Sequence, residues 1–369
     1  MKSGITAIGT ANPQYQRHQD ELCELASSLA NLSKAQHRVL RSVYRATGIN
    51  KRYSVLSDFC KKPGEFTFFP NDMNADFPST ARRMDVYKAN ALNLAVDAIK
   101  DCFNQLDQFN KQEITHLITV SCTGMYAPGI DIEIVQHMQL NPTTQRTAIN
   151  FMGCYGAFNG IKVADAICKA DSNAKVLLVC VELCSIHFQK TSDLANLISN
   201  AIFSDGAGAL VIEANPQRQR WLSLESFFCT LLPQSKQEMA WHIGDQGFDM
   251  ILSAYVPELI KTGIKDFTQQ LLSKTQMSLS DIHYFAIHPG GQKILEAAED
   301  SLEISKEDNR FSYEVMREYG NMSSATVLFV LKAIFLSIEA TDKGKSIFSC
   351  AFGPGLTLES MLLQVRGHD

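Results

Sequence analysis

The feature that most constrains the fold is an alternation of short apolar runs with segments of helical periodicity. Apolar residues that recur every three or four positions predict helices, and apolar runs bounded by turn residues predict strands. The predicted strands are 114–122, 175–182, 207–213, 283–288 and 345–352. The predicted helices are 87–106, 130–138, 159–170, 194–203, 254–272 and 324–341. Elements that alternate in this way pack as α/β layers, with sheets between helices.

The length of 369 residues is enough for two domains or one large duplicated unit. The most polar break near the middle is the segment 214–220, Ala-Asn-Pro-Gln-Arg-Gln-Arg. We therefore expect two similar halves, residues 1–215 and 216–369, although the sequence shows no internal repeat. No low-complexity linker separates them, so we expect the halves to pack tightly together.

Charge and cysteine usage exclude several classes of partner. The formal net charge is −5, and no run of Lys and Arg is long enough for a nucleic-acid or membrane surface. The N-terminus has no signal-peptide core and no stretch approaches 18 apolar residues, so we expect a soluble cytoplasmic protein. The ten cysteines form no CxxC motif, which predicts reduced thiols and no structural metal.

Cys154 is the first candidate for chemistry. It stands in the glycine-rich segment 150–160, just ahead of a predicted helix. Unpaired N–H groups at a helix N-terminus favour a thiolate, so we expect the pKa of this thiol to be lowered. Gly153 and Gly156 permit a tight turn and the close approach of a substrate carbonyl. An arbitrary cysteine is more often a buried structural residue, but the glycine frame favours a nucleophile.

Two polar residues in the second half complete a candidate active site. His288 ends a predicted strand at the turn His-Pro-Gly-Gly, ahead of a helix expected at 292–300. Asn321 lies in the glycine turn 319–324, where it or Ser323 could instead cap the next helix. A histidine at a strand end is more often an ordinary surface or core residue. Strand ends at glycine turns are nevertheless where α/β proteins carry functional groups.

A cysteine, a histidine and an asparagine together suit acyl transfer. The thiolate accepts an acyl group, and the imidazole holds the thiolate and donates to a thioester oxygen. The neutral amide completes an oxyanion site without adding charge. Cysteine hydrolases use similar sets, so these three residues alone leave both a protease and an acyltransferase open.

Six segments extend this pattern over essentially the whole chain. They are Ala-Ile-Gly-Thr-Ala-Asn-Pro at 7–13, Gly-Cys at 153–154, Phe-Ser-Asp-Gly-Ala-Gly at 203–208, Ile-His-Pro-Gly-Gly at 287–291, Gly-Asn-Met-Ser-Ser at 320–324 and Phe-Gly-Pro-Gly-Leu-Thr at 352–357. In this order they resemble the type III polyketide synthases, the chalcone synthase family. The resemblance implies a duplicated thiolase fold of five αβαβα layers, a homodimer, and decarboxylative condensation of malonyl-CoA onto a cysteine-bound starter.

The resemblance also assigns roles to individual residues. It makes Cys154 the nucleophile, and it makes His288 and Asn321 the groups that stabilise the enolate formed when malonyl-CoA loses CO2. It implies that Phe203 is an aromatic gate between the CoA tunnel and the growing chain, with ordinary core packing as the alternative. Further substrate-binding positions, two of them in a loop that shapes the cavity roof, are Ser323, Gly353 and Pro354.

Other cavity positions depart from the plant chalcone-forming pattern. Cys122, Cys184 and His187 stand where plant enzymes carry threonines, and Val256 stands at a second gate that is Phe in plants. Gly247 matches a glycine that leaves room for elongation. Cys122 and Val256 resemble bacterial relatives that house long acyl chains. The resemblance therefore implies aliphatic starters of medium or long chain and alkylpyrone or alkylresorcinol products, rather than naringenin chalcone.

A basic segment lies where the family binds the phosphates of CoA. The predicted CoA contacts are Arg41, Arg45, Lys51 and Arg52. A solvated helix face is the alternative for such a charge run.

Together these patterns predict a type III polyketide synthase, an acyltransferase that takes acyl-CoA and malonyl-CoA as substrates and needs no cofactor or metal. Two alternatives remain. One is a ketoacyl synthase that makes a single condensation with acyl carrier protein. The other is a catalytically inactive thiolase-fold binding subunit, against which the intact set of Cys, His and Asn argues.

Overall fold

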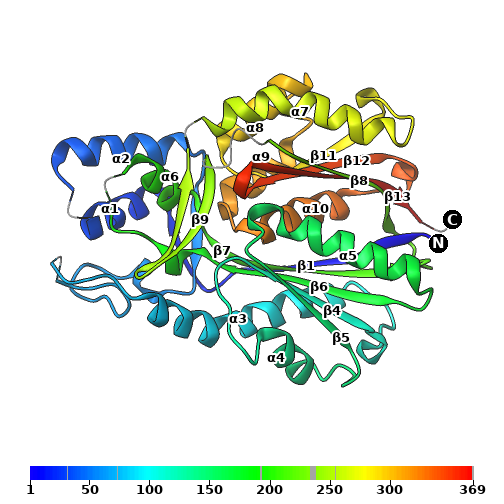
Figure 1. The fold of residues 1–369 in the computed structure, drawn as a ribbon, viewed down its shortest axis with the longest axis horizontal. Coiled ribbons are helices and arrows are strands. Elements are labelled where there is room, and N and C mark those ends of the chain that lie inside the picture. Colours follow the sequence, from blue (N-terminus) through cyan, green and yellow to red (C-terminus); the bar gives the residue numbers. More distant parts are fainter. Residues whose placement is uncertain (31, 73, 192, 233–237, 254, 368–369) are drawn as a thin grey trace.

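The centre of the molecule is a sheet of nine strands in two parts (Figure 1). The computed structural model describes the chain except for residues 31, 73, 192, 233–237, 254 and 368–369. The first part has the order β5 (Gln145–Asn150), β4 (His116–Ser121), β6 (Lys175–Leu183), β7 (Asp205–Ala214), β1 (Ser3–Ala11). The second part continues with β8 (Trp221–Leu231), β13 (Thr357–Arg366), β12 (Ser346–Gly353), β11 (Ile282–Ile287). The parts join where Gly4 and Ile5 of β1 pair with Ser223 and Leu222 of β8.

Helices cover both parts and also lie between them (Figure 1). α3 (Thr80–Phe103) and α4 (Ile130–His137) pack on the outer face of the first part, and α7 (Val256–Ser273), with α8 (Gln292–Leu302) against it, packs on the second. α5 (Gly156–Ala170) and α10 (Thr326–Ser337) fill the space between the two parts. This succession confirms the predicted five-layer αβαβα order.

Smaller elements gather at the end of the molecule that lies opposite the chain termini (Figure 1). They are the helices α1 (Gln19–Ala30), α2 (Lys34–Ala46) and α6 (Leu194–Ile202), the antiparallel pair β2 (Tyr15–His18) with β3 (Lys51–Ser54), and the antiparallel pair β9 (Met239–Gly244) with β10 (Gly247–Leu252). A further helix, α9 (Arg310–Tyr319), precedes the Gly320 turn.

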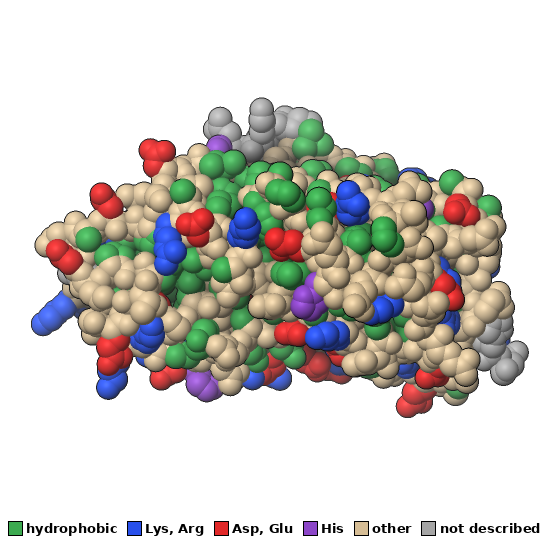
Figure 2. Space-filling view, turned by 90° about the horizontal axis from the view of Figure 1, so that it is seen from below, with side chains coloured by type: hydrophobic (Ala, Val, Ile, Leu, Met, Phe, Trp, Pro, Cys, Tyr) green, Lys and Arg blue, Asp and Glu red, His purple; other side chains and the backbone are tan. Residues whose placement is uncertain are grey.

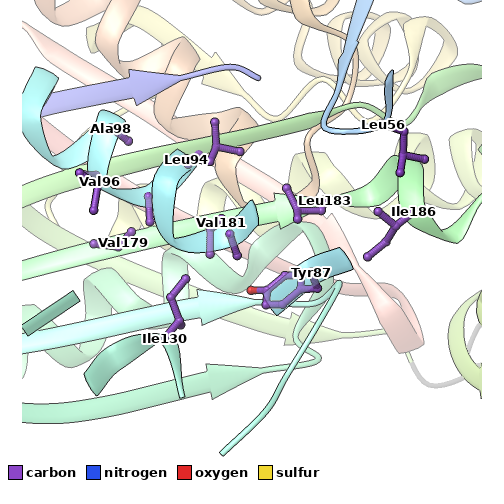
Figure 3. Packing of buried hydrophobic residues seen from close by; sticks show 14 of the residues in the cluster. Leu56, Tyr87, Leu94, Val96, Ala98, Ile130, Val179, Val181, Leu183 and Ile186 are labelled. Atoms are coloured by element: carbon purple, nitrogen blue, oxygen red, sulfur yellow. The ribbon is translucent and has the colours of Figure 1, made fainter. Parts of the chain in front are cut away.

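The layers follow from where the apolar side chains point. In β6, Val179 and Val181 belong to the core shared with α3, whereas Leu178 and Cys180 belong to the core shared with α5. Alternate residues of a strand point to opposite faces, so a strand covered on both sides is apolar throughout. Figure 3 shows the first of these cores, where side chains of α3 such as Leu94 lie above the strand.

The central helices must approach the strands closely. In α10, eight of the twelve residues are buried, because it packs against strands of both parts. In α5 the contact is made possible by Gly160, where an added Cβ would lie 2.5 Å from Leu178 Cδ1. The helix that starts beside Cys154 is therefore fixed tightly against β6.

Every predicted strand and helix range overlaps an observed element, with the described part of 254–272 corresponding to α7. The largest differences are at helix ends. α3 starts at Thr80 rather than 87, because Ser79 caps it by accepting a hydrogen bond from the N–H of Arg82. α10 ends at Ser337, before the predicted end at 341. The strands β1, β5, β8 and β13 were not predicted.

Within the described residues, no helix combines the length and apolar character needed to cross a membrane. In the same part of the chain, no three His, Cys, Asp or Glu side chains come together as a set of metal ligands. On the face shown in Figure 2, Lys and Arg side chains are interspersed with Asp and Glu. That face therefore offers no extended field of one sign.

Candidate active site

Cys154 lies in a short 3-10 turn, Gly153–Tyr155, between β5 and α5. The backbone is tightly bent there, since φ is +59° at Phe151 and +70° at Gly153. A Cβ on Gly153 would lie 2.2 Å from Cδ of Pro354, so glycine is needed for the conformation and for the contact. The thiol stands at the start of α5, as predicted, and its residue is only 6% exposed.

The end of β12 and the 3-10 turn that follows it support the cysteine turn. Pro354 packs against Gly153, and a Cβ on Gly353 would meet the ring of Tyr155 at 2.4 Å. Neither residue lines the cavity that contains Cys154, whereas Phe352 does. The structure thus gives Gly353 and Pro354 a supporting position under the cysteine turn in place of the predicted substrate contact.

The Asn321 amide faces the thiol in a defined orientation. Its Oδ1 accepts hydrogen bonds from the N–H of Ser323 at 2.8 Å and from Thr326 Oγ1 at 3.3 Å. Its Nδ2 donates to the carbonyl of Gly290 at 3.4 Å and lies 4.0 Å from Cys154 Sγ. Oδ1 lies at the same distance of 4.0 Å from Cys154 Sγ, but donors already engage it, so Nδ2 is the amide atom that keeps an N–H for a group beside the thiol.

His288 follows β11 and is almost completely buried, with 1% of its surface exposed. Neither Nδ1 nor Nε2 has a hydrogen-bond partner among the described residues. The backbone holds the residue instead, since its N–H donates to Cys350 O at 2.8 Å and its carbonyl accepts from Gly290 N at 2.9 Å. A buried imidazole without partners is costly and therefore a feature that needs an explanation.

One small cavity brings the three predicted residues together. We call it the catalytic cavity; it is lined by Cys154, Phe203, Met239, Met250, Leu252, His288, Gly290, Ile294, Asn321 and Phe352. Its volume of about 20 Å³ is room for little more than one water molecule. Met239, Met250 and Leu252 come from the β9 and β10 ribbon, and sequence reasoning missed all three. Met and Leu in a short apolar ribbon carry no distinctive sequence signal.

Burial keeps the thiol and the imidazole uncharged in this cavity. It raises the pKa of Cys154 to about 12, against which the side-chain hydrogen bonds of Ser323 and Asn321 act more weakly. It lowers the pKa of His288 to about 3. The predicted lowering of the thiol pKa is therefore wrong for this state, because loss of hydration outweighs the helix N-terminus. Ser323, predicted as a substrate-binding residue, lies beside the thiol but does not line the catalytic cavity.

Glu182, at the end of β6, is a site residue that sequence reasoning missed. Its buried carboxylate accepts hydrogen bonds from Cys122 N at 2.9 Å, Thr123 Oγ1 at 2.8 Å and Ser324 Oγ. Burial raises the pKa of Glu182 to about 7, and the charge of Glu182 in turn raises the pKa of Cys154. A carboxylate that ends an apolar strand is the signal that could have identified it.

The Phe203 ring stands between the catalytic cavity and a second space. This side cavity of about 40 Å³ is lined by Arg52, Phe59, Cys184, Ser185, His187, Phe188, Gln189, Asn196, Ser199, Asn200, Phe203, Trp241, Phe248 and Met250. Phe203 and Met250 line both spaces. Phe203 is thus a boundary residue, and Cys184 and His187 lie beyond it.

His187 is a neutral wall residue of the side cavity. Its Nε2 lies 2.7 Å from the Thr123 carbonyl, so Nε2 carries the proton, and Nδ1 accepts from the N–H of Phe248 at 3.0 Å. The ring stacks on Phe248 with 4.2 Å between centroids, and burial lowers the pKa of His187 to about 3. Trp241, whose ring lies 6.0 Å away, is a bulky neighbour that was not predicted.

A third space adjoins the catalytic cavity through a different part of its lining. We call it the outer channel; its volume is about 170 Å³, and it is lined by Val43, Ala46, Thr47, Ile198, Ile202, Leu252, Ser253, Val256, Pro257, Gly290, Gly291, Gln292, Lys293 and Ile294. Leu252, Gly290 and Ile294 line both this channel and the catalytic cavity. The predicted gate residue Val256 is therefore part of the outer channel wall.

Two predicted cavity residues lie elsewhere. The sulfur of Cys122 accepts from the N–H of Gly153 at 2.9 Å, which places it beneath the cysteine turn. A Cβ on Gly247 would lie 2.7 Å from Cδ of Arg83, so Gly247 makes room for that arginine. Neither residue lines the three spaces described above. Tertiary packing fills the room that the sequence pattern led us to expect.

The predicted CoA contacts do not form one site. Arg52 is buried and donates to the carbonyl of Phe203 at 2.7 Å, so its prediction as a phosphate ligand is wrong. Lys51 lies 3.6 Å from a Glu318 carboxylate oxygen, and Arg41 lies 2.7 Å from one of Glu24 on α1. Arg45 lies on the same flank of α2 as Arg41, where the charges of both act on the thiol of Cys23.

The five-layer fold defines a thiolase-like α/β protein. The sequence pattern described as "Chalcone and stilbene synthases, N-terminal domain" matches residues 1–216, and its C-terminal counterpart matches residues 223–366. The chain therefore belongs to the chalcone and stilbene synthase family, that is, the type III polyketide synthases, which are acyltransferases. This membership favours the predicted enzyme over a ketoacyl synthase.

Individual relatives agree over nearly the whole chain. The chain is 31% identical to "Alpha-pyrone synthesis polyketide synthase-like Pks18" of Mycobacterium tuberculosis, over 98% of this chain and 91% of that protein. It is 29% identical to a "Putative chalcone synthase" of Bacillus subtilis, over 97% of each. The crystal structure of PKS-I from the brown alga Ectocarpus siliculosus superposes with a TM-score of 0.91 at 30% identity, over 98% of both chains.

Proposed function

We propose that the protein condenses an acyl-CoA starter with malonyl-CoA on Cys154 and releases an alkylpyrone or alkylresorcinol. The observation that carries the proposal is the buried His288 imidazole, which lacks partners among the described residues and shares one cavity with the Cys154 thiol and the Asn321 amide. Unpaired donors aimed into a buried space are suited to a ligand oxygen or to a proton in transfer. Family members use acyl-CoA and malonyl-CoA as substrates.

Loading of the starter begins with the thiol. A neutral His288 has one nitrogen that can accept the proton of Cys154, which creates a thiolate and an imidazolium whose charges stabilise each other. The thiolate attacks the acyl-CoA carbonyl, so that a bond to Sγ forms and the bond to the CoA sulfur breaks. The CoA thiolate takes the proton from the His288 imidazolium as it leaves. The N–H groups of His288 and Asn321 stabilise the oxyanion of this step.

Extension uses the same donors a second time. Malonyl-CoA loses CO2, and the electron pair of the broken carbon–carbon bond becomes an enolate whose oxygen accepts from His288 and Asn321. The enolate carbon attacks the Cys154-bound acyl group, and the thiolate of Cys154 is the leaving group. Both substrates are CoA thioesters, so the proposed reaction requires no metal or further cofactor.

Two observations support an aliphatic starter. The side cavity beyond Phe203 has Cys184, Met250 and several aromatic rings in its wall, beside polar side chains such as Asn200, and contact with the apolar part is worth about 0.8 kcal/mol per buried CH2. The Mycobacterium relative at 31% identity is named for alpha-pyrone synthesis. The described side cavity is small, so a long chain requires its flexible side chains, such as Met250, to move.

We also propose that the protein works as a homodimer. β5 stands at one edge of the sheet, and five of its six residues are exposed. An edge strand leaves N–H and C=O groups free to pair with another chain. Light scattering coupled to size exclusion should give twice the 41.0 kDa chain mass, and a monomer at working concentration would contradict this part of the proposal.

The decisive experiment is incubation with a panel of acyl-CoAs and labelled malonyl-CoA, followed by mass spectrometry. The panel should run from acetyl-CoA to long-chain acyl-CoAs and include 4-coumaroyl-CoA, with Cys154→Ala as the inactive control. We expect labelled pyrones or resorcinols that carry an alkyl tail. No labelled product from any starter would overturn the proposed synthase, and products of a single extension would favour a ketoacyl synthase.

A further inference from the structure

We propose that Lys293 binds the phosphate-bearing arm of the CoA thioester at the mouth of the outer channel. The proposal rests on the proposed function and names a substrate contact that replaces the predicted Arg41 and Arg45. Three observations carry it: the lining of the channel, the position of Lys293 at the start of α8, and the orientation of α2.

The lining of the outer channel is almost entirely neutral. Among the described residues that form it, only Lys293 carries a charge at neutral pH, and most of the others are aliphatic or glycine. Lys293 is exposed and forms no ion pair with any described residue. The channel therefore presents one available cation at its solvent end and an apolar wall toward the catalytic cavity.

This order of groups matches the chemistry of CoA. The thiol end of CoA carries a neutral pantetheine arm, and the phosphates stand at the far end of that arm. A neutral arm fits the apolar wall formed by residues such as Val43, Ile202 and Val256, and the phosphates then meet a cation. Leu252, Gly290 and Ile294 also line the catalytic cavity, so the thioester end would point toward the cavity that contains Cys154.

The start of α8 adds to the positive charge. Lys293 is in the first turn of this helix, and the N-cap residue Gly291 supplies no side chain to cap the free N–H groups. The N-terminus of a helix attracts anions. One oxygen of the nearby Glu296 carboxylate accepts a hydrogen bond from Gln292 Nε2 at 2.8 Å.

The orientation of α2 removes the predicted arginines from the mouth. Val43, Ala46 and Thr47 are the α2 residues that line the channel. Successive residues of a helix are about 100° apart, so Arg45 points away from the flank of Val43. Arg41 pairs instead with Glu24 of α1, on the side of the helix that faces away from the channel.

The test is the affinity for free CoA, measured by calorimetry in reducing buffer on the full chain. We expect Lys293→Ala to weaken CoA binding about five-fold and Lys293→Glu to weaken it further, with both effects shrinking at high salt. Pantetheine, which lacks the phosphates, should bind all variants equally. Lys265→Ala is the matched control, because Lys265 pairs with Glu303 at the opposite end of α8.

Unchanged CoA affinity in Lys293→Ala would overturn the proposal. So would an equal loss in Arg45→Ala, which would return the phosphate site to the basic flank of α2. A loss of pantetheine affinity in the Lys293 variants would also count against it, since that would indicate a damaged channel. Binding of CoA needs no turnover, so a protein that binds CoA through Lys293 but forms no polyketide would refute only the proposed function.

Discussion

Phe203 and Asn321 are joined by an isolated parallel β-bridge, although they are distant in the sequence. The N–H of Ser204 donates to the carbonyl of Asn321, and the N–H of Asn321 donates to the carbonyl of Ile202, both at 2.9 Å. The ring at the boundary of two cavities and the amide that faces the thiol are thus held by one backbone contact. Arg52 stabilises this backbone contact further by donating a hydrogen bond to the carbonyl of Phe203.

Replacement of Cys154 by Ala should abolish acyl loading, because it removes the thiol of the catalytic cavity. Cys184 belongs to the same hydrophobic core and lines the side cavity, but it lies beyond Phe203. Intact-protein mass spectrometry after incubation with an acyl-CoA should show an adduct on the wild type and on the control Cys184→Ala. An adduct of equal yield on Cys154→Ala would remove this residue from the mechanism.

His288→Ala and Asn321→Ala should each slow malonyl-CoA decarboxylation by about 10²–10³-fold, since each removes a donor to the enolate oxygen. The measurement is release of labelled CO2 from malonyl-CoA. Circular dichroism should show that both variants are folded. Wild-type rates in both folded variants would mean that the oxyanion site lies elsewhere.

Glu182→Gln should increase the reactivity of Cys154, because it removes a buried charge that raises the pKa of the thiol. Iodoacetamide should therefore alkylate Cys154 faster in the variant than in the wild type at pH 8. A slower or equal rate would show that the hydrogen bonds of Glu182 matter more to the thiol than its charge does.

The same substitution should change how stability depends on pH. The pKa of Glu182 is raised from 4.5 to about 7 in the folded protein, so the unfolded chain loses this proton at a lower pH. The stabilising contribution of protonated Glu182 to the free energy of unfolding is therefore fully present below pH 4.5 and is lost as pH rises through about 7. Urea unfolding should show that the free energy of unfolding declines less between pH 5 and pH 8 in Glu182→Gln than in the wild type.

Cys184→Phe should shorten the preferred starter, because the added ring fills the side cavity beyond Phe203. We expect kcat/KM to fall for long-chain acyl-CoAs and to stay near the wild-type value for acetyl-CoA. Cys122→Phe should instead reduce loading of every starter, since the Cys122 sulfur supports the Gly153 turn. A uniform loss in Cys184→Phe would contradict this assignment of the cavity.

Local sequence signals were sufficient to select three of the polar residues that line the catalytic cavity. Cys154, His288 and Asn321 each stand in a glycine turn at the end of a regular element, and the family motifs surround all three. The layers were also predictable, because β4, β6, β7, β11 and β12 are apolar runs. β5 escaped prediction because an edge strand with exposed faces reads as the polar segment Gln-Arg-Thr-Ala-Ile-Asn.

Positions that depend on distant packing were not predictable. A basic helix indicates that α2 is charged, but only its contact with α1 determines that Arg41 faces Glu24. The burial of Arg52 depends on carbonyls near Phe203, and the space beside Gly247 is taken by Arg83. In each case a residue far away in the sequence decides what the side chain can reach.

The unpaired imidazole of His288 also has a cost for the folded state. A buried polar group without hydrogen bonds is worth about 1–3 kcal/mol of lost stability. An apolar residue of similar size, as in His288→Leu, should therefore raise the melting temperature while it abolishes condensation. The enzyme is then less stable than its own fold permits, and part of that loss of stability lies at a side chain that the substrate is expected to satisfy.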